Sequence, residues 1–247
     1  MNTAIVIPIH GALIQTDEML DSMVDTIPPC NVVCINDGTA SQLKKELERV
    51  VGKFATNNPS TPTTLLTNEK QQLFTRTVNR GIRYAVRHWN PDLILCINTD
   101  CILKQGWYEH LVGAFEDQRV GIAGYRDGYH MDYGKPYTEV KKPDYITGHC
   151  FGMRVSMLRE VGVLCETDTN GKQDPDLAPF LGQAHIGSER ILCWKANIYG
   201  WKTSYCNKNL VDHGTGASWG RDLGWLSNFD LQPLWEASDV IGGGLNE

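Results

Sequence analysis

The feature that most constrains this chain is the alternation of short apolar runs and amphipathic segments through its first hundred residues. The apolar runs, which we predict as strands, are residues 3–9, 31–35, 64–67 and 92–97. The segments with helical spacing of apolar side chains are residues 16–27, 41–54 and 75–89. Strands that alternate with helices indicate a parallel α/β sheet. Because the runs are continuously apolar, helices should cover both faces of that sheet.

The second half of the chain has a less regular pattern. The predicted helices are residues 106–117, 153–162 and 188–200, and the predicted strands are residues 120–124 and 144–148. Two polar loops are predicted, at residues 125–143 and 165–178. Gly200 is the expected end of the last helix.

Charge and cysteine spacing exclude several classes of protein. The formal net charge of −6 argues against a chain held by sequence-independent attraction to nucleic acid or anionic lipid, so we expect no stable nucleic-acid binding. No apolar run approaches the roughly 18 residues of a membrane span, and the first residues do not resemble a signal peptide, which predicts a soluble, cytoplasmic protein. The eight cysteines include no C-x-x-C pair, so we expect buried thiols in a reducing compartment.

Two carboxylates follow predicted strands. Asp37 ends the second strand in "INDGT", and Asp100 follows the fourth in "INTDCIL". Ligands of such sheets bind beyond the carboxyl ends of the strands, where both acids should lie. Either acid alone could simply turn the backbone. Together they are suited to sugar hydroxyls or to Mg²⁺ or Mn²⁺, whose oxygen ligands are completed by phosphate and water.

A nucleoside diphosphate fits that chemistry. The chain contains no G-x-x-x-x-G-K-[ST] sequence and no G-x-G-x-x-G after the first strand, which argues against a P-loop enzyme or a nicotinamide dehydrogenase. A metal ion, in place of a glycine-rich loop, would then hold the diphosphate.

Seven motifs, in order and with similar spacing, resemble the family-2-like GT-A glycosyltransferases over roughly residues 3 to 218. They are "IVIPIHG", "INDGT", "VNRGIRYA", "LILCINTDCIL", "DYITGHCFGMRVSMLREVG", "GSERILCWKANIYGWKT" and "DHGTGAS". The nearest resemblance is to the rhamnosyltransferase-like branch, where the metal motif often reads N-x-D. The resemblance implies a GT-A fold, a Rossmann-like nucleotide-sugar-binding fold with a mostly parallel central sheet flanked by helices.

We expect one domain over residues 1–247. Its predicted parts are a nucleotide-binding half (1–103), an acceptor and catalytic half (104–218) and a C-terminal tail (219–247).

The resemblance implies roles for residues at the donor. Asp37 would accept a hydrogen bond from the pyrimidine of a UDP- or dTDP-type donor, and Asp100 would bind the metal. Asn98, where many relatives have an acid, would contact ribose or a metal-bound water. His213 in "VDHGTG" matches a late histidine that completes the metal or phosphate contacts. An imidazole ligand favours Mn²⁺ over Mg²⁺ as the cofactor.

Further donor-site residues come from the same motifs. Pro8 and Asn79 lie in "IVIPIHG" and "VNRGIRYA", and we add both to the predicted donor-binding residues. Arg76 and Arg80, near the start of their helix, are expected to reach the donor phosphate or an anionic acceptor. In "TGHCFG", Gly148 would allow close approach and His149 would touch the transferred sugar.

Glu189 matches the second acid of the family's E-D pair, with Ser188 in place of the first. Inverting transfer is a single displacement that needs a base for the acceptor hydroxyl, and Glu189 would be that base. Alternatively, Glu189 only complements the positive end of its helix. Asp174 or Asp176 is the reserve candidate for the base.

The sequence therefore predicts a metal-dependent, inverting hexosyl- or deoxyhexosyltransferase. Its acceptor hydroxyl would belong to a glycan, lipid-linked sugar, protein or modified nucleic acid. A sugar-nucleotidyltransferase is the first alternative, but it would need a glycine-rich, arginine-containing loop after the first strand, which "PIHGALIQT" does not supply. A nucleotide-sugar-binding protein without turnover is the second, because Asn98 and Ser188 replace acids.

Overall fold

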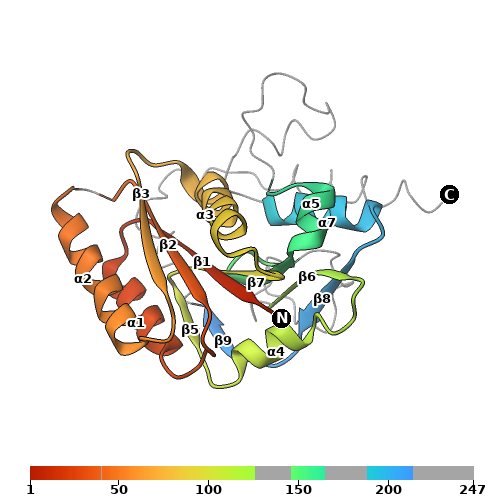
Figure 1. Cartoon of the computed structure of the whole chain (residues 1–247), viewed down its shortest axis with the longest axis horizontal. Coiled ribbons are helices and arrows are strands. Elements are labelled where there is room, and N and C mark those ends of the chain that lie inside the picture. The colour runs from red at the N-terminus through yellow and green to blue at the C-terminus, as the bar shows by residue number, and fades with distance from the viewer. Residues whose placement is uncertain (40, 126–145, 165–187, 214–247) are drawn as a thin grey trace, which may run out of the picture.

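A seven-stranded sheet forms the centre of the computed structural model, which describes residues 1–39, 41–125, 146–164 and 188–213 (Figure 1). Its strands are β1 (Thr3–Ile9), β2 (Asn31–Asp37), β3 (Thr63–Asn68), β4 (Leu93–Ile97), β6 (Val120–Tyr125), β7 (Cys150–Arg154) and β8 (Lys202–Cys206). They lie in the order β3-β2-β1-β4-β7-β6-β8. Only β7 runs antiparallel to its neighbours, β4 and β6. The predicted α/β class with a mostly parallel sheet is confirmed.

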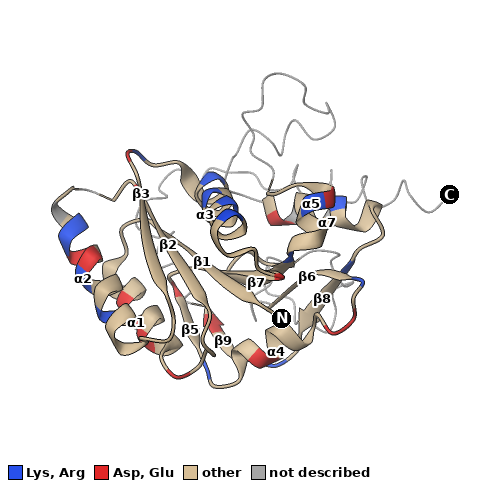
Figure 2. Cartoon of the chain, in the orientation of Figure 1, with Lys and Arg blue, Asp and Glu red and all other residues tan. Residues whose placement is uncertain are grey.

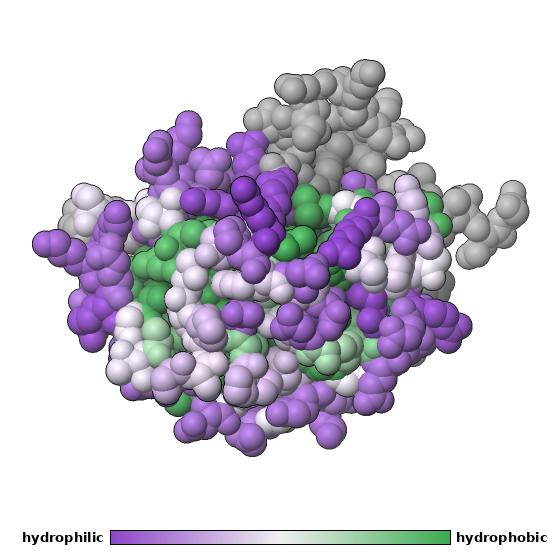
Figure 3. All heavy atoms as spheres, viewed as in Figure 1, coloured by the Kyte–Doolittle hydropathy of each residue, from purple (hydrophilic) through white to green (hydrophobic). Residues whose placement is uncertain are grey.

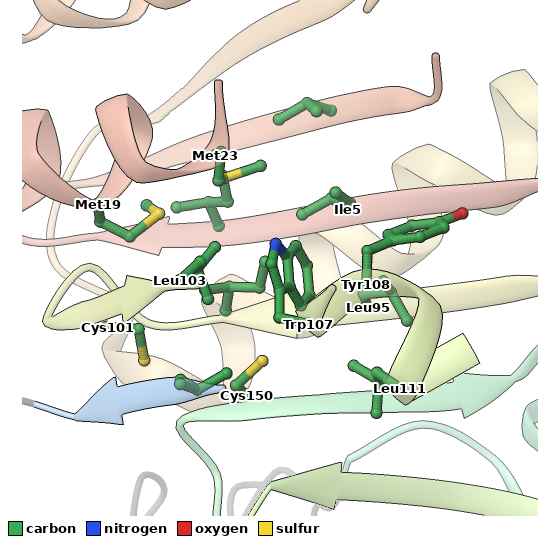
Figure 4. Close-up of a cluster of buried hydrophobic side chains, with 14 of the residues drawn as sticks. Ile5, Met19, Met23, Leu95, Cys101, Leu103, Trp107, Tyr108, Leu111 and Cys150 are labelled. Atoms are coloured by element: carbon green, nitrogen blue, oxygen red, sulfur yellow. The ribbon is translucent and has the colours of Figure 1, made fainter. Parts of the chain in front are cut away.

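Helices form a layer on each face of this sheet. The helices are α1 (Leu13–Met23), α2 (Ser41–Asn57), α3 (Leu73–Trp89), α4 (Trp107–Gly113), α5 (Val155–Val161) and α7 (Ser188–Ile198). Side chains of α1, α2 and α4 pack in one buried cluster, part of which Figure 4 shows, and those of α3, α5 and α7 pack in another. Because successive strand side chains point to opposite faces, β1 places Ile5 and Ile7 in the first cluster and Val6 in the second.

Hydrophilic residues dominate the outer surface in the view of Figure 3, and apolar residues show mainly in gaps between them. The continuous apolar strands are therefore explained by burial on both faces of the sheet. In the described part of the chain, no helix is both long and apolar enough to span a membrane.

Two predicted elements differ in place. Helix α1 begins before the predicted residue 16 and ends at Met23, because Val24 has an extended conformation and Asp25 a φ of 61°. The strand predicted at 144–148 is wrong in its described part: residues 146–148 are not a strand, and the strand is β7. Gly152 and Arg154 are poor strand signals, but Gly152 lets the side chains of Leu95 and Phe115 pack against the β7 backbone. The loop predicted at 125–143 lies outside the described residues except for Tyr125, which ends β6, and the loop predicted at 165–178 lies wholly outside them.

A second, two-stranded sheet joins distant parts of the chain. Strand β5 (Cys101–Leu103) pairs antiparallel with β9 (Val211–His213), and Cys101 lies opposite His213. The sequence did not predict this pairing. It brings His213 beside the turn that carries Asp100.

The described cysteines are free, buried thiols, as the sequence predicted. They are Cys30, Cys34, Cys96, Cys101, Cys150, Cys193 and Cys206. Burial raises the pKa of the Cys30, Cys34 and Cys206 thiols to about 12. A thiol with so high a pKa is not a reactive nucleophile near neutral pH.

Candidate active site

Asp37 lies at the carboxyl end of β2, where its side chain is almost fully buried. Its Oδ1 accepts hydrogen bonds from Asn68 Nδ2 at 2.8 Å and from the Gln72 backbone N–H at 2.7 Å. The parallel register of β2 and β3 places Asp37 opposite Asn68. Gly38 follows with a φ of 71°, and a Cβ there would lie 2.7 Å from the Lys70 carbonyl carbon. The loop after β2 and the loop before α3 therefore pack backbone to backbone.

Hydrogen bonds also tie the loop after β1 to the loop after β2. His10 Nδ1 lies 2.8 Å from the Asp37 carbonyl oxygen, which can only accept, so this nitrogen carries the proton. The Gly11 N–H donates to Thr39 Oγ1 at 3.1 Å, and the Thr39 N–H donates to Asn36 Oδ1 at 2.9 Å. Pro8 is half-buried near the end of β1, two residues before His10 in the chain. The edge of the sheet at the ends of β1 and β2 is thus held by contacts between the two loops.

Asp100, His149 and His213 meet at the same edge of the sheet. Asp100 Oδ1 lies 3.3 Å from His213 Nε2, and the Asp100 side chain is 4% exposed. The His213 ring stacks on the His149 ring with centroids 4.5 Å apart and planes 17° apart. These three predicted site residues come from the turn after β4, the turn before β7 and the end of β9. The structure therefore brings together side chains that are far apart in the sequence.

The turn that carries Asp100 is anchored to His149. The Asn98 N–H donates to the His149 carbonyl at 2.8 Å, and the Cys101 thiol donates to the same carbonyl at 3.3 Å. The Asn98 side-chain Oδ1 is buried without a hydrogen-bond partner among the described residues. A buried acceptor of this kind is costly unless a donor reaches it, so Asn98 has the geometry to accept from a bound ligand.

The Asp100 and His213 atoms fit a divalent ion. Neighbouring ligands of an octahedral ion with bonds of about 2.1 Å lie about 3 Å apart, close to the 3.3 Å between Asp100 Oδ1 and His213 Nε2. Among the residues described, no group of three His, Cys, Asp or Glu side chains is arranged to hold a metal. Two protein ligands are sufficient for Mg²⁺ or Mn²⁺ when phosphate and water complete the shell.

Glu189 lies in the first turn of α7, against Gly148. A Cβ on Gly148 would lie 3.3 Å from the Glu189 carboxyl carbon, so glycine leaves room for the acid. Burial first, and the Glu189 charge second, raise the pKa of the Cys96 thiol in β4. Glu189 Oε2 also lies 3.5 Å from Ser188 Oγ. The acid is therefore close to the carboxyl end of β4, as a residue of the same site would be.

Two predicted donor residues on α3 have different surroundings. Asn79 is fully buried, and its Nδ2 donates to the Leu164 carbonyl at 2.7 Å. This contact links α3 to the segment after α5, and the contact of Asn79 with the nucleotide-sugar donor stays a prediction. Arg76 is half-buried one turn from the start of the helix. Asp174 and Asp176, the reserve bases, lie outside the described residues.

Two residues for which the sequence indicated no specific role hold site side chains in place. Asn68 binds Asp37, and its position at the end of β3 was a signal of the same kind as that of Asp37 at the end of β2. Thr147 Oγ1 donates to the Tyr125 carbonyl at 2.9 Å and lies 2.9 Å from His149 Nδ1. Because the one hydroxyl proton goes to the carbonyl, His149 Nδ1 must be the donor to Thr147. Nothing in the sequence pattern indicated this contact.

Comparison with known proteins gives one family and a set of similar folds. The sequence model described as glycosyl transferase family 2 matches residues 4–145, more than half of the chain. No curated protein sequence matches this chain significantly.

Several solved glycosyltransferase structures have a similar fold. S. aureus TarS 1-349 in complex with UDP-GlcNAc gives a TM-score of 0.62 at 11% identity, covering 98% of this chain and 66% of that one. The mannosyltransferase PcManGT from Pyrobaculum calidifontis, in complex with GDP-Man and Mn²⁺, gives 0.59 at 13% identity, covering 83% and 54%. GalNAc-T7 with UDP, GalNAc and Mn²⁺ gives 0.60 at 15% identity, covering 83% and 42%.

This chain therefore spans about half to two thirds of the length of the first two structures, and less than half of the third. At these identities the likeness concerns the fold, and the GT-A fold predicted from the sequence is confirmed.

Proposed function

Because the chain belongs to glycosyl transferase family 2, we propose that it is a metal-dependent glycosyltransferase that moves a sugar from a nucleotide-diphosphate donor to an acceptor hydroxyl with inversion. The observation that carries the proposal is the buried pair of Asp100 Oδ1 and His213 Nε2, 3.3 Å apart. Asp37 lies at the same carboxyl edge of the sheet, where α/β folds bind nucleotides.

The donor nucleotide is expected along the loops that follow β1, β2 and β4. Asp37 accepts a hydrogen bond from the base of a UDP- or dTDP-type donor, beside Pro8 and the loop after it. Asn98, whose buried Oδ1 has no partner among the described residues, accepts from a ribose hydroxyl or a metal-bound water. Arg76 supplies positive charge toward the phosphates.

Asp100 and His213 hold the divalent ion, with Mn²⁺ preferred over Mg²⁺ because one ligand is an imidazole. When bound, the ion acts as a Lewis acid that neutralises charge on the leaving diphosphate. His149 lies against His213, which supports its proposed contact with the transferred sugar. The His149 carbonyl accepts a hydrogen bond from the turn that carries Asp100, so the same residue holds the proposed metal ligand and makes the proposed sugar contact.

Glu189 is the proposed base. Inverting transfer needs the acceptor hydroxyl to lose its proton as it attacks the anomeric carbon, and a carboxylate at the site edge can take that proton. Glu189 packs against Gly148, which directly precedes His149, the proposed sugar contact. The transferred sugar is a hexose or deoxyhexose, and the acceptor is a hydroxyl of a glycan, lipid-linked sugar, protein or modified nucleic acid.

A second candidate is a nucleotide-sugar-binding protein without turnover. It is favoured by Asn98 and Ser188, which stand where the family motifs often have acids. Such a protein would bind the donor in calorimetry and leave it intact over a long incubation.

The test is a thermal-shift panel of UDP, dTDP, GDP and CMP, each with Mn²⁺, Mg²⁺ or EDTA, on wild type and Asp100→Ala. A ligand that binds only the folded state raises the melting temperature. We expect a metal-dependent shift with UDP or dTDP that the substitution abolishes. No shift with any combination would reject the proposed donor site.

A further inference from the structure

A relay of three side chains leads from α3 to Asp37. The Arg80 guanidinium donates to the Thr67 carbonyl at 2.8 Å and to Asn68 Oδ1. Asn68 Nδ2 in turn donates to Asp37 Oδ1 at 2.8 Å and to Thr77 Oγ1 at 3.2 Å. Helix α3 carries several basic residues (Figure 2), and the sequence pattern had suggested that Arg80 reaches a phosphate or an anionic acceptor. Its observed partners lie at the end of β3 instead.

The relay has only one possible direction. A guanidinium has only donors and a carboxylate only acceptors, so Arg80 and Asp37 independently demand the same orientation of the Asn68 amide. Turning the amide over would place oxygen against Asp37 Oδ1 and N–H groups against Arg80. Asn68 is buried, at 7% exposure, whereas Arg80 is exposed on α3. Arg80 and Asp37 therefore both hold the Asn68 amide with its N–H toward Asp37.

The relay leaves Asp37 with one accepting oxygen for a ligand. Oδ1 receives two hydrogen bonds, from Asn68 Nδ2 at 2.8 Å and from the Gln72 N–H at 2.7 Å, which use the two lone pairs of that oxygen. The carboxylate cannot shift easily toward a ligand, because the backbone at Gly38 is packed against Lys70 and Gln71. Only Oδ2 of Asp37 is therefore available to accept a hydrogen bond from a bound nucleobase.

The nucleobases differ in what they can offer to a single acceptor. Uracil and thymine have one ring N–H between two carbonyl groups. Guanine presents two adjacent donors, a ring N–H and an exocyclic amine, while the corresponding ring nitrogen of cytosine is itself an acceptor. A buried donor without a partner, or an acceptor facing a carboxylate, lowers affinity. A single carboxylate oxygen thus matches the imide edge of uracil or thymine.

We propose that Arg80 and Asn68 are positioning residues that restrict Asp37 to one accepting oxygen, so that the site takes a uridine or thymidine diphosphate in preference to guanosine or cytidine diphosphate. The proposal rests on the proposed function, because it concerns the donor nucleotide of that reaction. It adds two residues that act through Asp37 without touching the base.

The experiment is calorimetric binding of UDP, dTDP, GDP and CDP, each with Mn²⁺, to the wild-type chain and four variants. In wild type we expect UDP or dTDP to bind about tenfold or more tightly than GDP and CDP, the effect of about one well-placed hydrogen bond. Arg80→Leu and Asn68→Ala remove the relay, and the preference for UDP over GDP should shrink to about threefold or less. Arg80→Lys keeps a donor to Asn68 and should retain most of the preference.

Arg87→Leu is the matched control, because Arg87 is an exposed arginine in the last turn of the same helix. It should keep the full base preference. Melting temperatures of all variants separate lost folding from lost recognition, and Asn68→Ala carries the test if Arg80→Leu does not fold.

Binding without base preference in wild type, or an unchanged preference in both Arg80→Leu and Asn68→Ala, would overturn the proposed role of the relay. The proposed glycosyltransferase function would still stand. Failure of every diphosphate to bind wild type would reject the proposed function and the relay together.

Discussion

The two sides of the site are held together in different ways. On the donor side, Asp37 is fixed by Asn68 and Gln72, and the loops after β1 and β2 are cross-linked by His10, Gly11 and Thr39. These contacts join consecutive β-α units of the parallel half of the sheet. On the catalytic side, three separate segments meet through a 3.3 Å acid–imidazole contact, one ring stack and a shared carbonyl. The donor side is built locally, whereas the catalytic side depends on long-range docking.

This difference suggests that recognition of the nucleotide and chemistry at the sugar can be separated by mutation. Changes on the catalytic side should reduce turnover, metal affinity or contact with the donor sugar, and leave metal-free nucleotide binding intact. Changes on the donor side should alter folding stability or base choice first.

The largest effect is expected for Glu189→Gln. Loss of a general base should lower turnover by about 10²–10⁴-fold, while the isosteric amide keeps the packing against Gly148. Release of nucleoside diphosphate from the donor, with water as the acceptor, is the measurement. Glu116→Gln, an exposed acid between α4 and β6, is the control and should retain full turnover. Undiminished turnover in Glu189→Gln would reject the base assignment and direct attention to Asp174 and Asp176.

Asp100→Ala should lower the affinity for Mn²⁺ by at least about tenfold, because it removes a charged ligand from beside His213. Metal binding can be measured by calorimetry, and UDP binding in EDTA should be the same in wild type and variant. A loss of metal-free UDP binding would contradict the separation of the two sides, since Asp100 would then belong to nucleotide recognition as well.

On the donor side, Gly38→Ala should destabilise the fold by roughly 2 kcal/mol or more. Its φ of 71° disfavours any L side chain, and the Cβ would meet the backbone of Lys70 and Gln71. Urea unfolding measures the change. Gly52→Ala is the matched control, because Gly52 lies inside α2 with open space around it, and alanine there should stabilise by about 0.5–1 kcal/mol. Equal effects of the two substitutions would show that the donor-side loops are not tightly packed.

The smallest effect is expected for Thr147→Val, which removes the hydroxyl that accepts the His149 Nδ1 proton. We expect a rise of a few-fold in the KM for the donor, the size of one neutral hydrogen bond, with kcat less affected. Nitrogen NMR shifts of His149 should show the Nδ1-protonated ring in wild type and a different proton distribution in the variant. Thr147→Ser keeps the hydroxyl and should restore the wild-type KM and the wild-type NMR shifts of His149. The wild-type NMR pattern in Thr147→Val would show that Thr147 does not determine which nitrogen of His149 carries the proton.

The sequence predicted the donor side well, for a physical reason. Continuous apolar strands and the helical spacing between them determine a parallel sheet, and a parallel sheet places the ends of its strands at one edge. Asp37, and Asp100 of the catalytic side, could therefore be placed at that edge without any structure. Arg80 was placed on the right helix, but its partners were not predicted, because spacing along a helix does not show which strand end lies beneath it.

The catalytic side was predicted less completely. Strand β7 was misplaced, because its Gly152 and Arg154 are unusual in strands and are explained only by their neighbours: Arg154 is buried and donates to the carbonyls of Val120 and Phe115. The motif that contains Asn79 suggested a ligand contact but did not indicate that its Nδ2 donates to the Leu164 carbonyl. The contact of His213 with Asp100 depends on β9, which is too short to be recognised from its sequence.

The pairing of β5 with β9 also bears on the order of events during synthesis. The parallel strands β1 to β4 and their helices leave the ribosome early, so the edge that carries Asp37 can form while the rest of the chain is still being made. His213 is the last residue described, and it reaches Asp100 only after β9 has emerged and paired with β5. A nascent chain would therefore form most of the sheet before Asp100 and His213 can meet, and the proposed metal site would be complete only once synthesis has passed β9.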